Sequence, residues 1–183
     1  MKKLGGSTAL AAGLMLILLV GVHALAGAGD NKTHVKADML TGYQETPGVA
    51  SEGSGTFSAT IDDDSTAPTI TFEETYSGLS APALVSHVHF GNRFDAGGVS
   101  FFLCGGGGRP PCPPGTTTPA TVTGTVTPAD VIGPAGQGIA PGQFGKIVAA
   151  MRAGVAYANV HTSNFPAGEI RGQINDDNQR QVP

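Results

Sequence analysis

Three of the five histidines lie in two short segments whose composition predicts β-strands. Segment 86–92 reads Ser-His-Val-His-Phe-Gly-Asn and segment 157–162 reads Tyr-Ala-Asn-Val-His-Thr. Because successive side chains on a strand alternate between faces, His87 and His89 point to the same side. Two imidazoles on one face and a third, His161, from another strand are the smallest set that holds a transition-metal ion. The spacing therefore predicts a site for one copper or zinc ion, provided that the two strands meet.

Polar residues near these strands have two interpretations. Tyr157 and Asn159 share a face with the third histidine, and Glu169 and Arg171 reach that face if the last two strands pair. Glu45 is a further candidate, from a loop. Around a metal, such groups fix the tautomers of the ligating imidazoles. Without a metal, they form a buried network that ties strands together, with Arg171 forked onto Glu169 or Glu45. Both interpretations stay open.

The elements that must position these residues are short strands separated by turns. Alternating apolar and polar residues, with β-branched and aromatic side chains, predict strands at 34–40, 55–61, 69–76, 84–90, 98–103, 120–126, 155–162 and 169–174. Short helices are expected at 127–132, which opens with Thr and Pro, and at 143–153, which precedes a Gly. This pattern predicts an all-β domain, an antiparallel Greek-key β-sandwich or flattened barrel of about seven or eight strands with one or two short helices.

Composition agrees with a turn-rich β protein. Only 13% of the 183 residues are charged, while Gly (28) and Pro (13) are abundant. The first residues resemble an export signal, since Lys2 and Lys3 precede an apolar run and Ala24-Leu25-Ala26 fits a cleavage site. We expect a signal peptide over 1–26, a polar leader over 27–32, one β domain over 33–175 and a flexible tail over 176–183. An uncleaved membrane anchor is the alternative for the first segment.

The expected mature chain is acidic. Cleavage would remove two lysines and leave eight basic against 14 acidic residues, a formal charge of −6. Binding to nucleic acid depends on neutralising phosphates with Lys and Arg, so nucleic acid is not an expected partner. After cleavage we expect no membrane association, and a location that is secreted, periplasmic or at the cell surface.

The two cysteines, Cys104 and Cys112, enclose a Gly- and Pro-rich loop. In an exported protein the expected state is a disulfide that closes this loop and lowers the entropy of its unfolded form. A metal site on the two thiols is the alternative, which an oxidising compartment disfavours.

Five motifs in order resemble the CHRD (chordin-type) domain over about Val35 to Ile174. They are Leu40-x-Gly42-x-Gln44-Glu45-x-Pro47, His87-Val88-His89, Phe102-Leu103-Cys104, Tyr157-x-Asn159-Val160-His161-Thr162 and Pro166-Ala167-Gly168-Glu169-Ile170-Arg171-Gly172-Gln173-Ile174. The resemblance implies an extracellular all-β module, found in secreted bacterial proteins and in animal chordin, an antagonist of growth factors. It implies no established catalytic activity.

The segment His87-Val88-His89-Phe90-Gly91-Asn92 is also similar to the copper-ligand strand of copper–zinc superoxide dismutases. Such enzymes need further histidines and an aspartate soon after this strand, and here no histidine lies between His89 and His161. The likeness therefore implies one metal ion at most, and no dismutase activity is expected.

Two functions follow as hypotheses. The first is a secreted, non-catalytic CHRD-domain binding or scaffold module that contacts an extracellular protein and holds one copper or zinc ion on its three histidines. The alternative is a mononuclear copper protein for metal binding or redox work, with superoxide dismutase-like topology. An enzyme is the less favoured interpretation, because the chain has no Gly-x-Ser-x-Gly elbow and no phosphate-binding loop ending in Gly-Lys-Ser/Thr.

Overall fold

The computed structural model describes residues 32–62 and 66–174, together with Met1. The predicted signal peptide, nearly all of the polar leader and the tail lie outside the described residues. Eight antiparallel strands form one sheet, which confirms the all-β prediction: β1 Lys32–Thr41, β2 Ser54–Asp62, β3 Thr69–Ser77, β4 Ala83–Phe90, β5 Gly98–Cys104, β6 Ala120–Val126, β7 Ala156–Thr162 and β8 Ile170–Gln173. Each corresponds to one of the eight strands expected from the sequence.

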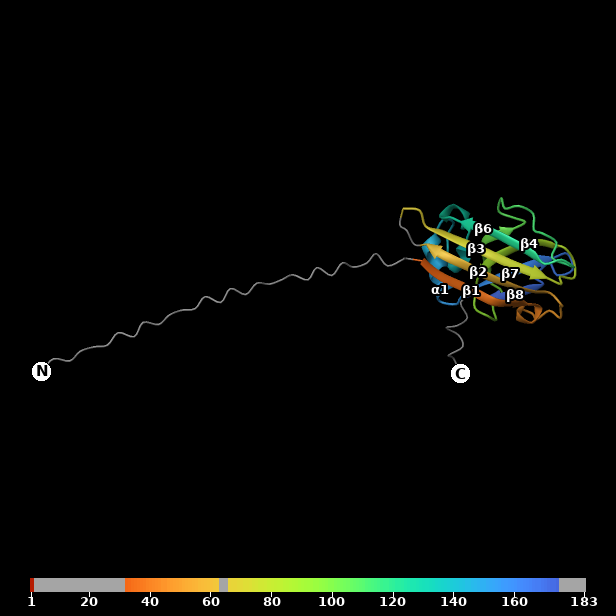
Figure 1. Cartoon of the computed structure of the whole chain (residues 1–183), viewed down its shortest axis with the longest axis horizontal. Coiled ribbons are helices and arrows are strands. Elements are labelled where there is room, and N and C mark those ends of the chain that lie inside the picture. The colour runs from red at the N-terminus through yellow and green to blue at the C-terminus, as the bar shows by residue number, and fades with distance from the viewer. Residues whose placement is uncertain (2–31, 63–65, 175–183) are drawn as a thin grey trace.

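The sheet curls into a nearly closed barrel. Its strand order is β5-β4-β7-β8-β1-β2-β3-β6, so β1, β2 and β3 form a meander and the chain then crosses to β4, as in a Greek key. The edge strands β5 and β6 lie in contact, although no ladder joins them among the described residues. Figure 1 shows the strands wrapped around a common core, with α1 (Phe144–Arg152) at one end. Of the two architectures expected, the flattened barrel is the one observed.

Helical segments are short, as predicted. Apolar residues at helical spacing bury one side of α1, and Gly154 follows at φ 72°, a left-handed conformation that Gly adopts without strain. The segment expected at 127–132 is a single 3-10 turn, η2 (Pro128–Asp130), closed by a capping box between Thr127 and Asp130. Two further 3-10 turns are η1 (Gly42–Gln44) and η3 (Ala135–Gln137). None of the described helices is long and apolar enough to cross a membrane.

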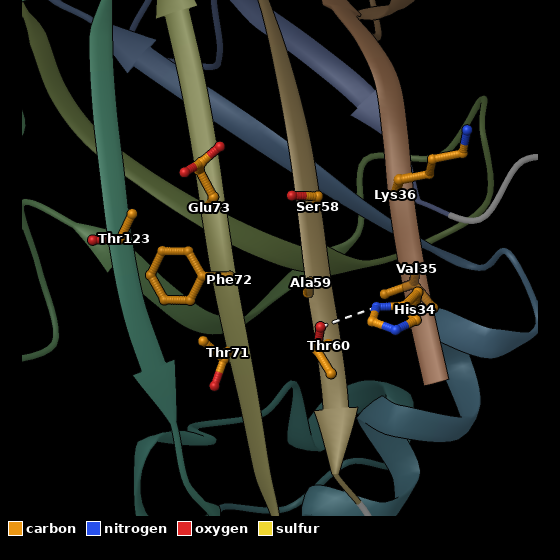
Figure 2. A pocket seen from close by; sticks show the side chains of 10 residues that line it. All are labelled: His34, Val35, Lys36, Ser58, Ala59, Thr60, Thr71, Phe72, Glu73 and Thr123. Carbon is orange, nitrogen blue, oxygen red and sulfur yellow. Dashed lines mark hydrogen bonds between the residues drawn. The ribbon is translucent and has the colours of Figure 1, made fainter. Parts of the chain in front are cut away.

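Strand periodicity explains the core on one side of the barrel. In β2, Phe57, Ala59 and Ile61 are buried in the interior, and the residues between them face outward. The outer face of β1, β2, β3 and β6 carries an open hollow of about 530 Å³, where His34 bonds Thr60 (Figure 2). This wall is thus buried on one face only.

The opposite wall is buried on both faces. Every residue of β7 and β8 is buried, as are four consecutive residues of β4, Ser86 to His89. Antiparallel strands with one solvated face normally alternate between buried and exposed positions. Side-chain bonds from Arg171 to the carbonyls of Asn92 and Asp95, and from Asn159 to Glu45, show what covers the outer face: the loops after β4 and after η1. The covered outer face is where the predicted site residues meet.

Candidate metal centre

The three predicted histidines converge on this covered face. β4 pairs with β7 in a register that places His87 opposite Asn159 and His89 opposite Tyr157, so all three imidazoles lie on one side of the two strands. One ring nitrogen from each lies within 4.8 Å of those of the other two. The ring of His87 is central, with its centroid 4.5 Å from those of both His89 and His161. The condition set by the sequence, that the two strands meet, is fulfilled.

The hydrogen bonds of two rings leave their other nitrogen free for a ligand. His89 donates from Nδ1 to the carbonyl of Gly97 at 2.8 Å, and His161 donates from Nδ1 to the carbonyl of Pro166 at 3.0 Å. Because a carbonyl only accepts, each Nδ1 carries the proton and each Nε2 presents a lone pair when the imidazole is neutral. Such second hydrogen bonds orient metal-ligating histidines in general.

Three buried nitrogens of the cluster have no hydrogen-bond partner among the described residues. They are Nε2 of His89, Nε2 of His161 and Nδ1 of His87. The three residues are only 6% to 8% exposed, so water does not cover these atoms freely. A buried polar atom without a partner costs about 1 to 3 kcal/mol. Three such atoms in one place therefore require an explanation, and a metal ion bound by all three supplies one.

Burial keeps these imidazoles neutral. It lowers the pKa of His87 to about 2, and repulsion from a charged His89 or His161 adds to the effect. Burial lowers the pKa of His89 to about 4 against the opposing bond to Gly97, and it also lowers the pKa of His161. A metal binds the neutral imidazole, so burial favours the ligand form of all three rings.

Aromatic rings form the walls of the centre. Tyr157 stacks on His89, with ring centroids 4.6 Å apart and planes at 3°. The guanidinium carbon of Arg171 lies 3.4 Å from the centroid of the same tyrosine ring. Phe102 of β5 packs edge-on against His87 at 5.3 Å. The rings fix the imidazole planes and limit the space around the three nitrogens.

Asn159 and Glu45 form a hydrogen-bonded pair beside the histidines. The amide of Asn159 donates to Glu45 Oε1 at 2.6 Å and to the carbonyl of Ile170 at 2.9 Å. Burial raises the pKa of Glu45 to about 7, although the bond from Asn159 and the charge of Arg171 favour its ionised form. The predicted placement of Glu45 from a loop is thus observed, but among the described residues no carboxylate belongs to the cluster of possible metal ligands.

Arg171 and Glu169 do not pair as the metal-free interpretation expected. The guanidinium of Arg171 bonds the carbonyls of Asp95 and Asn92 at 2.8 and 2.6 Å, in place of a fork onto Glu169 or Glu45. Glu169 accepts bonds from Ser51, Ser80 and Thr162 on another part of the molecule. The reason is competition: Glu169 lies just before β8 (Ile170–Gln173), and both oxygens of its carboxylate are already engaged by hydroxyl groups.

Three residues that hold the centre were not among those predicted for it. Gly97 and Pro166 act through backbone carbonyls, which have no side-chain signature in a sequence. A Cβ at Gly97 would overlap the carbonyl oxygen of Phe90, so the close approach of its loop to β4 requires Gly. Phe102 is the third. Its pairing opposite His87 identifies it, and that register is seen only in the structure.

Within residues 32–62 and 66–174, no other group of side chains offers a comparable set of ligands. The hollow in Figure 2 is lined by hydroxyl-bearing side chains with Lys36 and Glu73, and its His34 is an exposed residue bonded to Thr60, as expected for a surface histidine. Cys104 and Cys112 form the predicted disulfide, with Cα atoms 5.0 Å apart, which excludes the alternative of thiolate ligands.

Comparison with known proteins identifies the family of the domain. A family model described as the CHRD domain matches residues 37–174, which includes all three histidines and both cysteines. No curated protein and no solved structure matches the chain.

Proposed function

This chain belongs to the CHRD-domain family, and on that premise we propose that it is an extracellular, non-catalytic module that binds one copper or zinc ion. His87, His89 and His161 are the ligands. The observation that carries the proposal is a cluster of three buried histidines, each with one buried ring nitrogen that has no partner among the described residues. Three imidazoles are a set of ligands that both ions accept.

The metal-free alternative explains the site less well. A structural network satisfies its buried polar atoms within itself. Here Asn159, Glu45 and Arg171 are satisfied by one another or by backbone carbonyls, whereas the three histidine nitrogens are not. The histidines are thus the members of the cluster that point to a ligand from outside the chain.

The extracellular location has two supports. A disulfide of the kind formed by Cys104 and Cys112 persists in oxidising compartments. The N-terminal sequence favours export by a signal peptide over 1–26. A scaffold role towards an extracellular protein partner rests on family membership, and we expect that role to tolerate His87→Ala as long as the domain folds.

Elemental analysis tests the metal site. The purified domain is incubated with Cu(II) or Zn(II), dialysed and analysed, beside the double variant His87→Ala/His161→Ala and the control His34→Ala, which removes the exposed histidine of the opposite wall. We expect about one equivalent of metal in the wild type and the control, and less than about a tenth in the double variant. Circular dichroism checks that the double variant is folded. Equal retention by all three proteins, or by none, contradicts the proposal.

A further inference from the structure

The histidine cluster supplies no negative charge to an ion bound there. All three candidate ligands are neutral imidazoles, and no carboxylate or thiolate among the described residues joins them. An ion bound here brings its full charge into a site whose ligands are 92% or more buried. Taking an uncompensated charge out of water is unfavourable, and the cost rises steeply with the charge.

A buried positive charge lies beside the cluster. Arg171 is 2% exposed, and its guanidinium lies over the face of Tyr157, whose ring also stacks on His89. Its hydrogen bonds run to the neutral carbonyls of Asn92 and Asp95, and the carboxylates of Glu45 and Asp95 attract it without a hydrogen bond to it. A second cation bound by His89 therefore experiences repulsion through a poorly solvated path, and this repulsion is twice as large for a divalent ion.

Carboxylates near the centre compensate for this charge only in part. Oε1 of Glu45 is engaged by Asn159, and burial raises the pKa of this carboxyl to about 7, so it is largely protonated in mildly acidic solution. Glu169 is held by Ser51, Ser80 and Thr162. Glu74 lies in the barrel interior, bonded to Ser86, the neighbour of His87 whose side chain points to the opposite face.

We propose that this centre selects a monovalent ion, Cu(I), over Zn(II) and Cu(II). The inference rests on the metal site proposed above and adds its selectivity. Three imidazole nitrogens complete the coordination that Cu(I) prefers, whereas Zn(II) almost always takes four ligands and here would recruit water or an anion. Both the neutral ligand set and the buried guanidinium favour an ion of charge +1 over an ion of charge +2.

Competition between the two ions tests the selectivity. The domain is incubated without oxygen in equimolar Cu(I) and Zn(II), with Cu(I) buffered by bicinchoninate, then separated from the chelator and analysed for both metals. We expect wild type to retain Cu(I) at about one equivalent, with at least about a tenfold excess over Zn(II). Retention of Zn(II) in equal or greater amount overturns the inference while leaving the metal site intact. Retention of neither ion contradicts the metal site itself.

A pair of variants at Phe102 tests whether charge is the cause. This half-buried side chain packs against His87, so Phe102→Glu places a carboxylate beside the cluster. Phe102→Gln is the matched control, because glutamine has nearly the same shape as glutamate and carries no charge. We expect the Cu(I)-to-Zn(II) ratio of Phe102→Glu to fall about tenfold or more below that of Phe102→Gln. Since both variants lose the same aromatic contact, equal ratios in the two overturn the electrostatic explanation.

Discussion

Backbone atoms of Gly97 connect His89 to the loop that covers it. The carbonyl accepts from His89 Nδ1 at 2.8 Å, and the amide donates to the hydroxyl of Tyr157 at 2.9 Å. One residue therefore orients both the His89 imidazole and the ring stacked on it. Substitution at such a position changes the site without removing any group that touches the metal.

Gly97→Ala is expected to destabilise the domain and weaken its metal site, because the added Cβ overlaps the carbonyl oxygen of Phe90. We expect the free energy of unfolding to fall by about 1 to 3 kcal/mol, as in other overpacked positions, and metal affinity to fall with it. Denaturant unfolding and metal titration measure the two effects. Gly136→Ala is the control, since its Cβ meets no atom within 4 Å; if both variants behave alike, the role given to Gly97 is wrong.

Glu74 is a carboxyl group in the barrel interior, on the inward face of β3. It is fully buried, its Oε1 accepts from Ser86 at 2.9 Å, and its Oε2 has no partner. Burial raises its pKa from 4.5 to about 8, against the opposing bond from Ser86. The native state thus holds a proton that the unfolded chain releases above about pH 4.5.

The contribution of Glu74 to stability should therefore fall as pH rises through this window. It is complete below about pH 4.5 and is lost progressively up to about pH 8, by at most about 1.4 kcal/mol per pH unit. We expect the stability of Glu74→Gln, measured relative to wild type at the same pH, to increase between pH 5 and pH 8. Denaturant unfolding at several pH values measures this, with the exposed neighbour Glu73→Gln as a control that keeps the wild-type profile. A wild-type profile in Glu74→Gln would show that Glu74 is ionised in the fold.

At the scale of elements, the disulfide loop packs against Phe102, which in turn contacts the histidine cluster. Cys104 ends β5, and the glycines that follow it fold back over Phe102: a Cβ at Gly106 or Gly107 would lie about 2.6 Å or less from that ring. Phe102 in turn packs on His87. The same loop carries Arg109, which donates to the carbonyl of Thr125 on β6 and so bridges the gap between the two edge strands.

Removing the disulfide should weaken both the contact between the edge strands β5 and β6 and the packing around the three histidines. For a loop of this length, Cys104→Ser/Cys112→Ser is expected to lower the free energy of unfolding by about 2 to 3 kcal/mol. Because the loop backs Phe102, we also expect weaker metal retention in protein that is still folded. Denaturant unfolding and metal titration test this, and wild type reduced by a phosphine should match the variant. Unchanged metal retention in the folded variant would contradict the supporting role of the loop.

Much of the element structure could be predicted from the sequence because local periodicity determines it. The alternation in β2 and the shared face of His87 and His89 follow from the two-residue repeat of a strand. Pairing of β4 with β7 did not follow, since the two are separated by about 70 residues and nothing local encodes which strands become neighbours. The same limit applied to Glu169, whose partners Ser51 and Ser80 come from distant parts of the chain.

At the scale of the whole molecule, the barrel has two unlike walls. The wall of β1, β2, β3 and β6 alternates as a half-solvated sheet does, and Figure 2 shows its polar outer face. The wall of β4, β7 and β8 is covered by loops, and it carries all three histidines. Composition and spacing predicted the barrel as one of two architectures, but the covering of one wall depends on loop contacts through Arg171 and Asn159 that no periodic pattern records.

X-ray absorption at the metal edge of the loaded domain tests the central claim most directly, because it reports the atoms bound to the ion. We predict a shell of three nitrogen neighbours at about 2.0 Å, with the multiple-scattering pattern of three imidazole rings, and a loss of one ring's contribution in His161→Ala. A shell of oxygen neighbours without imidazole scattering, unchanged in that variant, would contradict the assignment of His87, His89 and His161 as the ligands of one metal ion.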